Sequence, residues 1–157
     1  MSIRDEMPLL ARHEGEWKGT YIHIDAEGHI LDQHASHLSC EFPQDGPYPY
    51  FQTNRYTWAD GRSEEIKFPA TYHDGKLWFD TERIKGYAWE VDDKTILLTW
   101  VYTTEPENYL YEMIQLSPCG NHRARTWHWF KDGQLFKRTL IKEERDSNAE
   151  CGMRNAD

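Results

Sequence analysis

Tight turns recur along the chain at short intervals, and they limit the folds that it can adopt. Three turns carry an Asp-Gly pair, at residues 60–61, 74–75 and 132–133. Such a pair favours a hairpin turn, because glycine has no Cβ to clash at the positive φ angle that the turn needs. Three further turns carry Asp, Asn or Gly, at residues 25–29, 91–95 and 117–122. The chain is therefore predicted to form a series of antiparallel hairpins.

Between the turns, aromatic and β-branched residues take alternate positions, which is the period of a strand with one buried face. The pattern predicts ten strands, at residues 16–25, 29–42, 48–58, 64–72, 76–82, 84–91, 95–103, 108–117, 122–131 and 134–143. Successive hairpins with no helix between them make an up-and-down meander, and so many strands avoid exposed edges best by closing. We therefore predict an all-β fold, an up-and-down antiparallel β-barrel of about eight to ten strands.

We predict one domain over residues 1–157, because a chain of this length supports a single core. The barrel is expected at about residues 15–145. Before it, the sequence MPLLARHE (7–14) predicts a short helical plug, in which Leu9 and Leu10 cover one end of the barrel. After it, residues 146–157 are polar and are predicted to be a flexible tail.

The charge of the chain argues against several classes of partner. Lys and Arg total 18 against 27 Asp and Glu, and the net charge of −9 repels nucleic acid and anionic membrane surfaces. No apolar run approaches the roughly 20 residues of a membrane span, and the N-terminus lacks a secretory layout. Cys40, Cys119 and Cys151 fit neither a disulfide framework nor a zinc spacing, and are interpreted as reduced thiols. A soluble, cytoplasmic protein is expected.

The stretch GEWKGTY (15–21) places Trp17 between Gly15 and Gly19, at the start of the first predicted strand. With the meander, it resembles the first strand of the calycins, the superfamily of lipocalins, fatty-acid-binding proteins and nitrobindins, which carries a Gly-x-Trp signature. Residues 122–145, with an Arg-x-Arg strand and a Glu-Arg ending, are also similar to an uncharacterised lipocalin-like family found in bacteria. The resemblance implies a tryptophan across the closed base of a calycin-like barrel, packed under a basic residue of a late strand. Arg125 and Arg138 are the candidates.

A barrel of this size is filled by its own side chains or holds one small ligand. The predicted interior mixes rings with polar tips, whereas a filled core would favour Leu, Ile and Val. Buried polar atoms without partners cost several kcal/mol, so a ligand-filled cavity explains this lining better. The alternative is that these rings stand on half-exposed sheet faces. A filled barrel that acts as a partner-binding scaffold would have no pocket.

The first predicted function is binding of a small hydrophobic or aromatic molecule, held by ring stacking and oriented by a few polar groups. The expected walls are Tyr21, Tyr56, Trp89, Tyr111 and Trp127. The expected polar anchors are His23, His34, Asn54 and Arg125. Outward-facing rings would also allow a homodimer.

The alternative is a cofactor-independent lyase, isomerase, decarboxylase or cyclase acting on a small aromatic or polyketide-like substrate. His34 would transfer the proton, because the ordinary pKa of histidine lies near neutrality. Tyr56 or Tyr111 would donate to a developing oxyanion, and Arg125 would hold substrate charge. No nucleophile elbow, Walker lysine or G-x-G-x-x-G motif is present. The calycins include both carriers and catalysts, so the resemblance leaves both functions open.

The eight histidines predict no metal site, because no pair has the helical spacing of a zinc motif. A site assembled across strands would leave no local spacing to read. The nitrobindin resemblance implies a haem bound through a late histidine, for which His128 is the candidate. The parity of His128 is opposite to that of Trp127 and Trp129, which points it outward. No cofactor is therefore expected.

Overall fold

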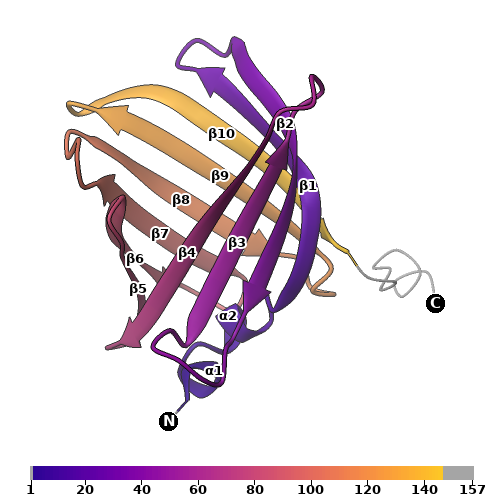
Figure 1. The fold of residues 1–157 in the computed structure, drawn as a ribbon, viewed down its shortest axis with the longest axis vertical. Helices are drawn as coiled ribbons and strands as arrows, with labels where there is room; N and C mark the ends of the chain where they lie inside the picture. Colours follow the sequence, from indigo (N-terminus) through magenta and orange to yellow (C-terminus); the bar gives the residue numbers. More distant parts are fainter. Residues whose placement is uncertain (1, 147–157) are drawn as a thin grey trace.

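The computed structural model describes residues 2–146, and ten strands account for most of them. Each strand pairs antiparallel with its neighbours in sequence, and the first strand pairs with the last, so the sheet closes (Figure 1). The strands are β1 (Gly15–Asp25), β2 (Ile30–Glu41), β3 (Tyr50–Thr57), β4 (Ser63–His73), β5 (Lys76–Asp80), β6 (Ile84–Glu90), β7 (Thr95–Tyr102), β8 (Asn108–Leu116), β9 (His122–Lys131) and β10 (Gln134–Arg145). The predicted all-β, up-and-down barrel is confirmed.

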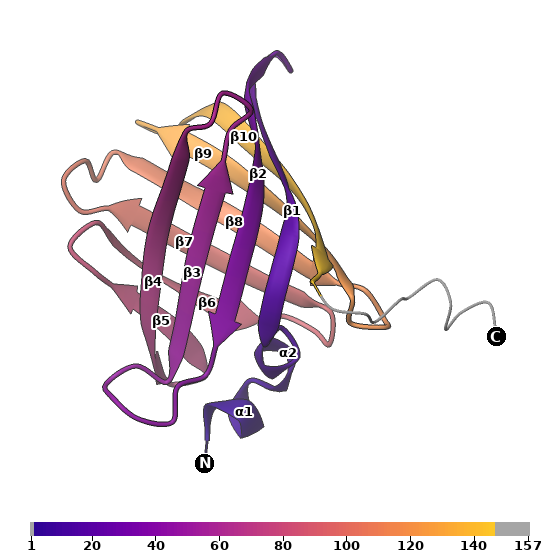
Figure 2. The ribbon, with the colours of Figure 1, turned by 45° about the vertical axis from the view of Figure 1, so that its right-hand side comes forward.

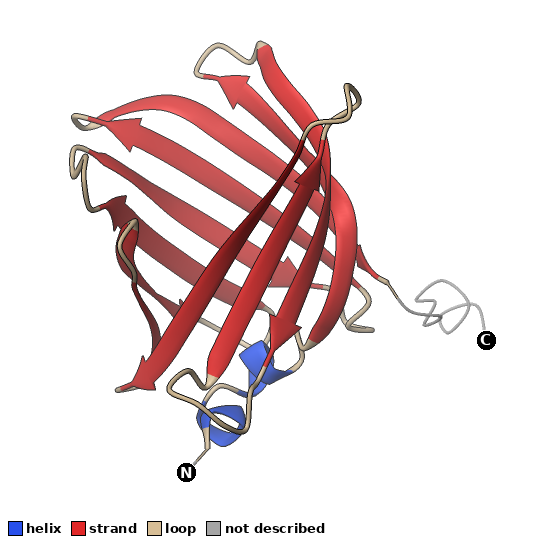
Figure 3. Ribbon diagram, viewed as in Figure 1, coloured by secondary structure: helices blue, strands red, loops and turns tan. Residues whose placement is uncertain are grey.

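Two short helices, α1 (Ile3–Glu6) and α2 (Pro8–Ala11), lie against one end of the barrel (Figures 2 and 3). Ser2 caps α1 by accepting a hydrogen bond from the Asp5 backbone N–H. Leu9 and Leu10 are buried, and the Leu10 N–H donates to the Glu90 carboxylate at the end of β6 over 2.7 Å. The predicted helical plug is therefore confirmed.

The Asp-Gly turns have the backbone that their sequences predict. Asp74 and Asp132 have positive φ angles of 53° and 51°, and the glycine after each is also positive. Two consecutive positive φ angles are the mark of the type I′ hairpin turn. At the third pair only Gly61 has a positive φ, and its N–H donates to the Trp58 carbonyl in a slightly longer hairpin loop.

The base of the barrel is organised around Trp17, which is fully buried. The guanidinium carbons of Arg123 and Arg145 lie 4.6 and 4.4 Å from its ring, and its Nε1 donates to the His13 carbonyl. The expected contact with a late basic residue is present, but Arg125 and Arg138 were the wrong candidates. The register decides this, because Trp17 on β1 pairs directly with Arg145 on β10.

Gly19 explains why the signature has a second glycine. A Cβ on Gly19 would lie 2.0 Å from the Lys142 carbonyl oxygen, which is closer than any real contact. The missing side chain lets the backbone of β10 come close beside β1, its partner in the sheet, at this point.

Next to Trp17, buried charges form a network across β8, β9 and β10. Arg123 Nε donates to Glu143 over 2.6 Å, and Arg125 Nε donates to Glu112 over 2.6 Å. Arg125 also donates to the second Glu143 oxygen over 3.1 Å and to the Tyr21 hydroxyl over 2.9 Å. Burial alone would raise the pKa of Glu143, but the two guanidinium groups hold it below its ordinary value. Two cations and two carboxylates thus balance in the core.

Among residues 2–146, no helix is long and apolar enough to cross a membrane.

Cys40 is a buried free thiol, but Cys119 takes part in a disulfide, so its interpretation as a reduced thiol was wrong. Cys151, and the predicted tail from residue 147 on, lie outside the described residues.

Candidate functional site

A cavity of about 170 Å³ opens at the end of the barrel opposite the helices. We call it the upper cavity. Its aromatic lining comprises Tyr21, Tyr56, Trp58, Phe68, Trp100, Tyr102, Trp127 and Trp129. Its charged and imidazole groups are His23, Asp32, His34, Glu64, Arg83 and Lys137. Strands from all around the barrel contribute to this lining, so the cavity is part of the lumen.

Three rings separate the upper cavity from a smaller one of about 40 Å³ below it. Phe68, Trp100 and Trp127 line both cavities and form the floor of the upper one. Phe68 stacks on Trp100 with 5.5 Å between ring centroids, and Trp100 meets Trp127 edge-on at 6.2 Å. The lower cavity has room for only a few water molecules. A ligand of any size therefore belongs above the floor.

His34 lies in the wall of the upper cavity, and its side chain is only 4% exposed. It stacks on Tyr21 with 5.1 Å between centroids and contacts the edge of Tyr56 at 4.8 Å. Its Nδ1 lies 3.1 Å from Asp32 Oδ2, whereas its buried Nε2 has no hydrogen-bond partner among the described residues. The ring is thus fixed in place with one nitrogen free.

Asp32 is itself held in position. The Nε1 of Trp58 lies 3.0 Å from both carboxylate oxygens and donates to them. Burial would raise the pKa of Asp32, but hydrogen bonds from Trp58 and His34 lower it. The sequence analysis did not select Asp32. The available signal was its parity, because Asp32 precedes His34 by two residues on one strand face.

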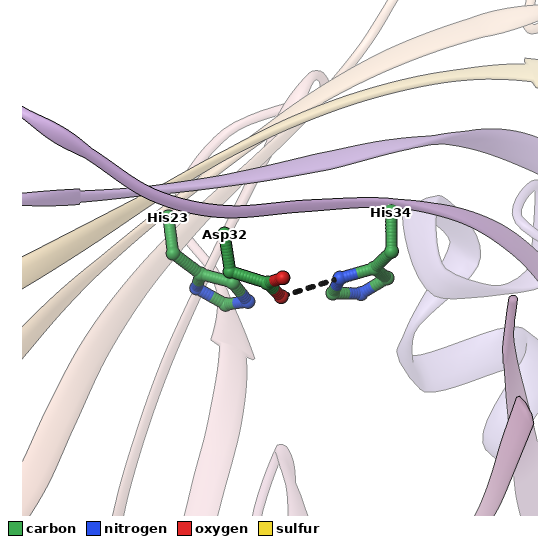
Figure 4. Close-up of side chains that lie close together, drawn as sticks. All are labelled: His23, Asp32 and His34. Carbon is green, nitrogen blue, oxygen red and sulfur yellow. Dashed lines mark hydrogen bonds and ion pairs between the residues drawn. The ribbon is translucent and has the colours of Figure 1, made fainter. Parts of the chain in front are cut away.

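His23 is the partner of Asp32 across the β1–β2 pair (Figure 4). Its Nδ1 lies 2.7 Å from the Thr139 hydroxyl, which also accepts a hydrogen bond from Trp129. Burial, together with the charge of Lys137, lowers the pKa of His23 to about 4. This imidazole is therefore neutral at physiological pH.

The structure brings together five of the predicted site residues at the upper cavity: Tyr21, His23, His34, Tyr56 and Trp127. Asn54 and Arg125 lie below the floor, against the lower cavity. The Arg125 guanidinium is already bonded by Glu112, Glu143 and Tyr21. It is therefore not free to hold the charge of a ligand above the floor.

The predicted lumen positions of Trp89 and Tyr111 were wrong. On β6 Ile84 lines the upper cavity and Ala88 the lower one, whereas Trp89 packs against Tyr87 on the opposite face. On β8 Leu110 and Glu112 are buried, while Tyr111 is 53% exposed and contacts Phe130 outside. On both strands the rings stand on the outward face, and the inward face carries aliphatic, small or polar residues, so the aromatic pattern indicated the wrong face. His128, the haem candidate, alternates on β9 with Trp127 and Trp129, which line the cavity. It therefore lies on the other face of the strand, away from the lumen.

The closed meander, the plugged base and the ring-lined upper cavity define a calycin-like, lipocalin-like barrel. The sequence model described as "Domain of unknown function (DUF3598), N-terminal" matches residues 5–148. The chain therefore belongs to the DUF3598 family.

Solved structures with this fold include three with low sequence identity. A DUF3598-family protein from Nostoc punctiforme PCC 73102 has a TM-score of 0.67 at 19% identity, over 87% of this chain but 48% of that protein. This chain thus spans about half the length of that relative. The S-type phycobiliprotein lyase CPES from Guillardia theta has a TM-score of 0.72 at 14% identity, over 95% of each chain.

The third structure, Rv2717c from M. tuberculosis, has a TM-score of 0.62 at 13% identity, over 90% of this chain and 98% of that one. At these identities the likeness establishes the fold alone. No curated protein matches the chain.

Proposed function

We propose that the upper cavity binds a small, planar aromatic molecule. The observation that carries the proposal is the cavity itself, which is walled by rings and open at one end. Its volume of about 170 Å³ is close to that of an engineered cavity of roughly 150 Å³ that binds benzene. A ligand of one or two rings would fit above the floor, and any longer part would extend through the open end.

The polar groups of the cavity support a ligand with a polar substituent. The free Nε2 of His34 offers one hydrogen bond from the wall. Lys137 lies over the ring of Trp129, with its Nζ 4.2 Å from the centroid, and burial lowers its pKa. A phenol, an aryl ketone or an aromatic acid would use these groups, which are few and lie among rings as in other small-molecule sites.

The binding proposal is tested with 2-naphthol as the probe, titrated against the intrinsic fluorescence of the tryptophans. Ile66 on β4 lines the upper cavity, and Lys67 next to it is exposed. We expect Ile66→Trp to fill the space and weaken binding at least about tenfold, a loss of about 1.4 kcal/mol. Lys67→Trp adds the same ring outside the barrel and should bind as the parent does. Equal affinities in the two variants would refute a site in the upper cavity.

The natural ligand is sought by native mass spectrometry of the protein purified from its own host. A bound species retained by the parent protein and lost from Ile66→Trp would identify the ligand class. The phycobiliprotein lyase shares the fold at 14% identity, so its substrate is not transferred to this chain.

Proton-transfer catalysis, without a cofactor, is the second candidate, and the arrangement of His34 favours it. Asp32 holds Nδ1, and Nε2 remains free in a buried wall. A histidine oriented through one nitrogen uses the other to bond or transfer a proton. After incubation in D₂O, a carrier would release its ligand unchanged. Such an enzyme would instead exchange a C–H hydrogen of the ligand for deuterium, or form product. His34→Gln should abolish that exchange while binding persists.

Three other predictions stay proposals. Tyr109, Tyr111 and Phe130 stack on the outer wall, and this patch would suit a homodimer. Analytical ultracentrifugation of the parent and of Tyr111→Glu tests it, because a charge in a buried interface would dissociate the dimer. The cytoplasmic location and the absence of a nucleic-acid partner rest on the sequence analysis.

A further inference from the structure

We infer that His23, Asp32 and His34 form a site for a divalent transition-metal ion such as Zn²⁺, at the wall of the upper cavity. This inference does not depend on the proposed aromatic ligand. The sequence analysis predicted no metal site, because it could search only for ligands spaced along one element.

The three residues meet through the register of one hairpin. His23 on β1 is directly opposite Asp32 on β2, and His34 follows Asp32 by two residues (Figure 4). Residues two apart on a strand, and residues directly opposite on its neighbour, project from the same face of a sheet. One ligand atom from each of the three lies within 4.8 Å of the others. The backbone of two rigid strands therefore sets the arrangement.

The donor set suits a borderline metal ion. Two imidazole nitrogens and one carboxylate oxygen are the ligands of many catalytic zinc sites, which keep a fourth position open. Ligand atoms about 2.1 Å from a tetrahedral ion lie roughly 3.4 Å apart. His34 Nδ1 and Asp32 Oδ2 are 3.1 Å apart already. An ion between them would replace their hydrogen bond, and His23, whose ligand atom lies within 4.8 Å of the other two, would move closer to complete the set.

Outer contacts hold the three side chains from two other strands. Trp58, just past β3, donates to the Asp32 carboxylate, and Thr139 on β10 contacts His23 Nδ1. The Thr139 contact leaves His23 Nε2 to face the cluster. Such outer hydrogen bonds orient metal ligands and raise their affinity. The His29–Asp25 pair, by contrast, lies at a hairpin tip, where the His29 side chain is 71% exposed.

Charge limits the affinity of the site. Asp32 supplies the negative charge of the cluster, and Lys137 lines the same cavity with a positive charge. The cation and the ammonium group would repel each other. We therefore expect micromolar rather than nanomolar binding, and we expect Lys137→Gln to bind Zn²⁺ several-fold more tightly.

The test is titration of chelator-treated protein with Zn²⁺ by isothermal calorimetry, and with Co²⁺ by visible absorption, which reports four-coordinate geometry. We expect one ion per chain, and at least a hundredfold weaker binding in His23→Ala and Asp32→Asn. Asp32→Asn keeps the shape of the side chain, and circular dichroism checks that each variant is folded. His29→Ala is the matched control, because it removes an exposed histidine 3.0 Å from Asp25 at the tip of the same hairpin.

Parent affinity in His29→Ala, with loss in both cavity variants, would support the site. The inference is overturned if the parent protein binds no Zn²⁺ with a saturable isotherm. It is equally overturned if His29→Ala weakens binding as much as Asp32→Asn does, because the ion would then sit on surface histidines. Retention of 2-naphthol binding by Asp32→Asn would separate loss of the metal from loss of the aromatic site.

Discussion

Replacing Glu143 with glutamine tests the buried ion network most directly. The Glu143 carboxylate is fully buried and accepts from Arg123 over 2.6 Å and from Arg125 over 3.1 Å. Glutamine has the same shape but no charge, so Arg123 would lose the carboxylate that it pairs with and Arg125 would keep only Glu112. Breaking a buried ion pair by removing one partner costs about 3–5 kcal/mol. We expect a loss of about 4 kcal/mol or more, since the carboxylate serves two cations.

The assay is urea unfolding followed by tryptophan fluorescence, together with thermal melts. A loss of about 4 kcal/mol corresponds to a Tm roughly 8–16 °C lower in a chain of this size. Glu144→Gln is the matched control, because Glu144 is exposed and lies 3.8 Å from the equally exposed Lys18. That variant should lose less than about 1 kcal/mol.

A Glu143→Gln variant within 1 kcal/mol of Glu144→Gln would refute the argument that the core needs this charge. A double variant adds a second test. Arg123→Met in the Glu143→Gln background restores charge balance, so it should destabilise the protein less than it does in the parent. Additive losses would show that the two residues are not coupled.

Three further outcomes follow from the same contacts. The Glu143 pKa is lower in the folded than in the unfolded protein, so its stabilisation is present above the ordinary value of 4.5 and is lost as pH falls below it. The parent should therefore lose more stability than Glu143→Gln between pH 5 and pH 3 in thermal melts. Gly19→Ala should cost about 3 kcal/mol or more in urea unfolding, since its Cβ would overlap the Lys142 carbonyl. Tyr111→Ala should leave the 2-naphthol affinity unchanged in the fluorescence titration, because Tyr111 lies on the outer wall.

The fold was predictable because its determinants are local. The Asp-Gly turns at 74–75 and 132–133 set hairpins, and strict alternation such as Tyr50 to Trp58 set strands with one inward face. Trp17 and Gly19 then marked the closed base. Each of these signals lies within a few residues of sequence, where propensity and period are strongest.

The site was only partly predictable because it depends on register between strands. Alternation placed Tyr21, His34 and Tyr56 correctly, because each shares its face of the strand with another ring or polar group that also lines the lumen. It failed for Trp89 and Tyr111, because the rings of their strands stand on the outward face while aliphatic, small or polar residues face inward. Asp32 was missed because its neighbours in space, His23 and Trp58, are fixed by pairing across strands. For the same reason, Arg125 was predicted to pack against Trp17, although Arg123 makes that contact.

The pairing of β1 with β10 has a consequence for how the barrel is made. All other pairs join consecutive strands, whereas Trp17 must find Arg145 at the far end of the chain. Loop-closure entropy favours nearby partners, so the seam should form after the hairpins on either side of it. A chain arrested before that step would carry two unsatisfied strand edges at once. Those edges would recruit other chains, so the last strand protects the molecule against aggregation as well as completing its lumen.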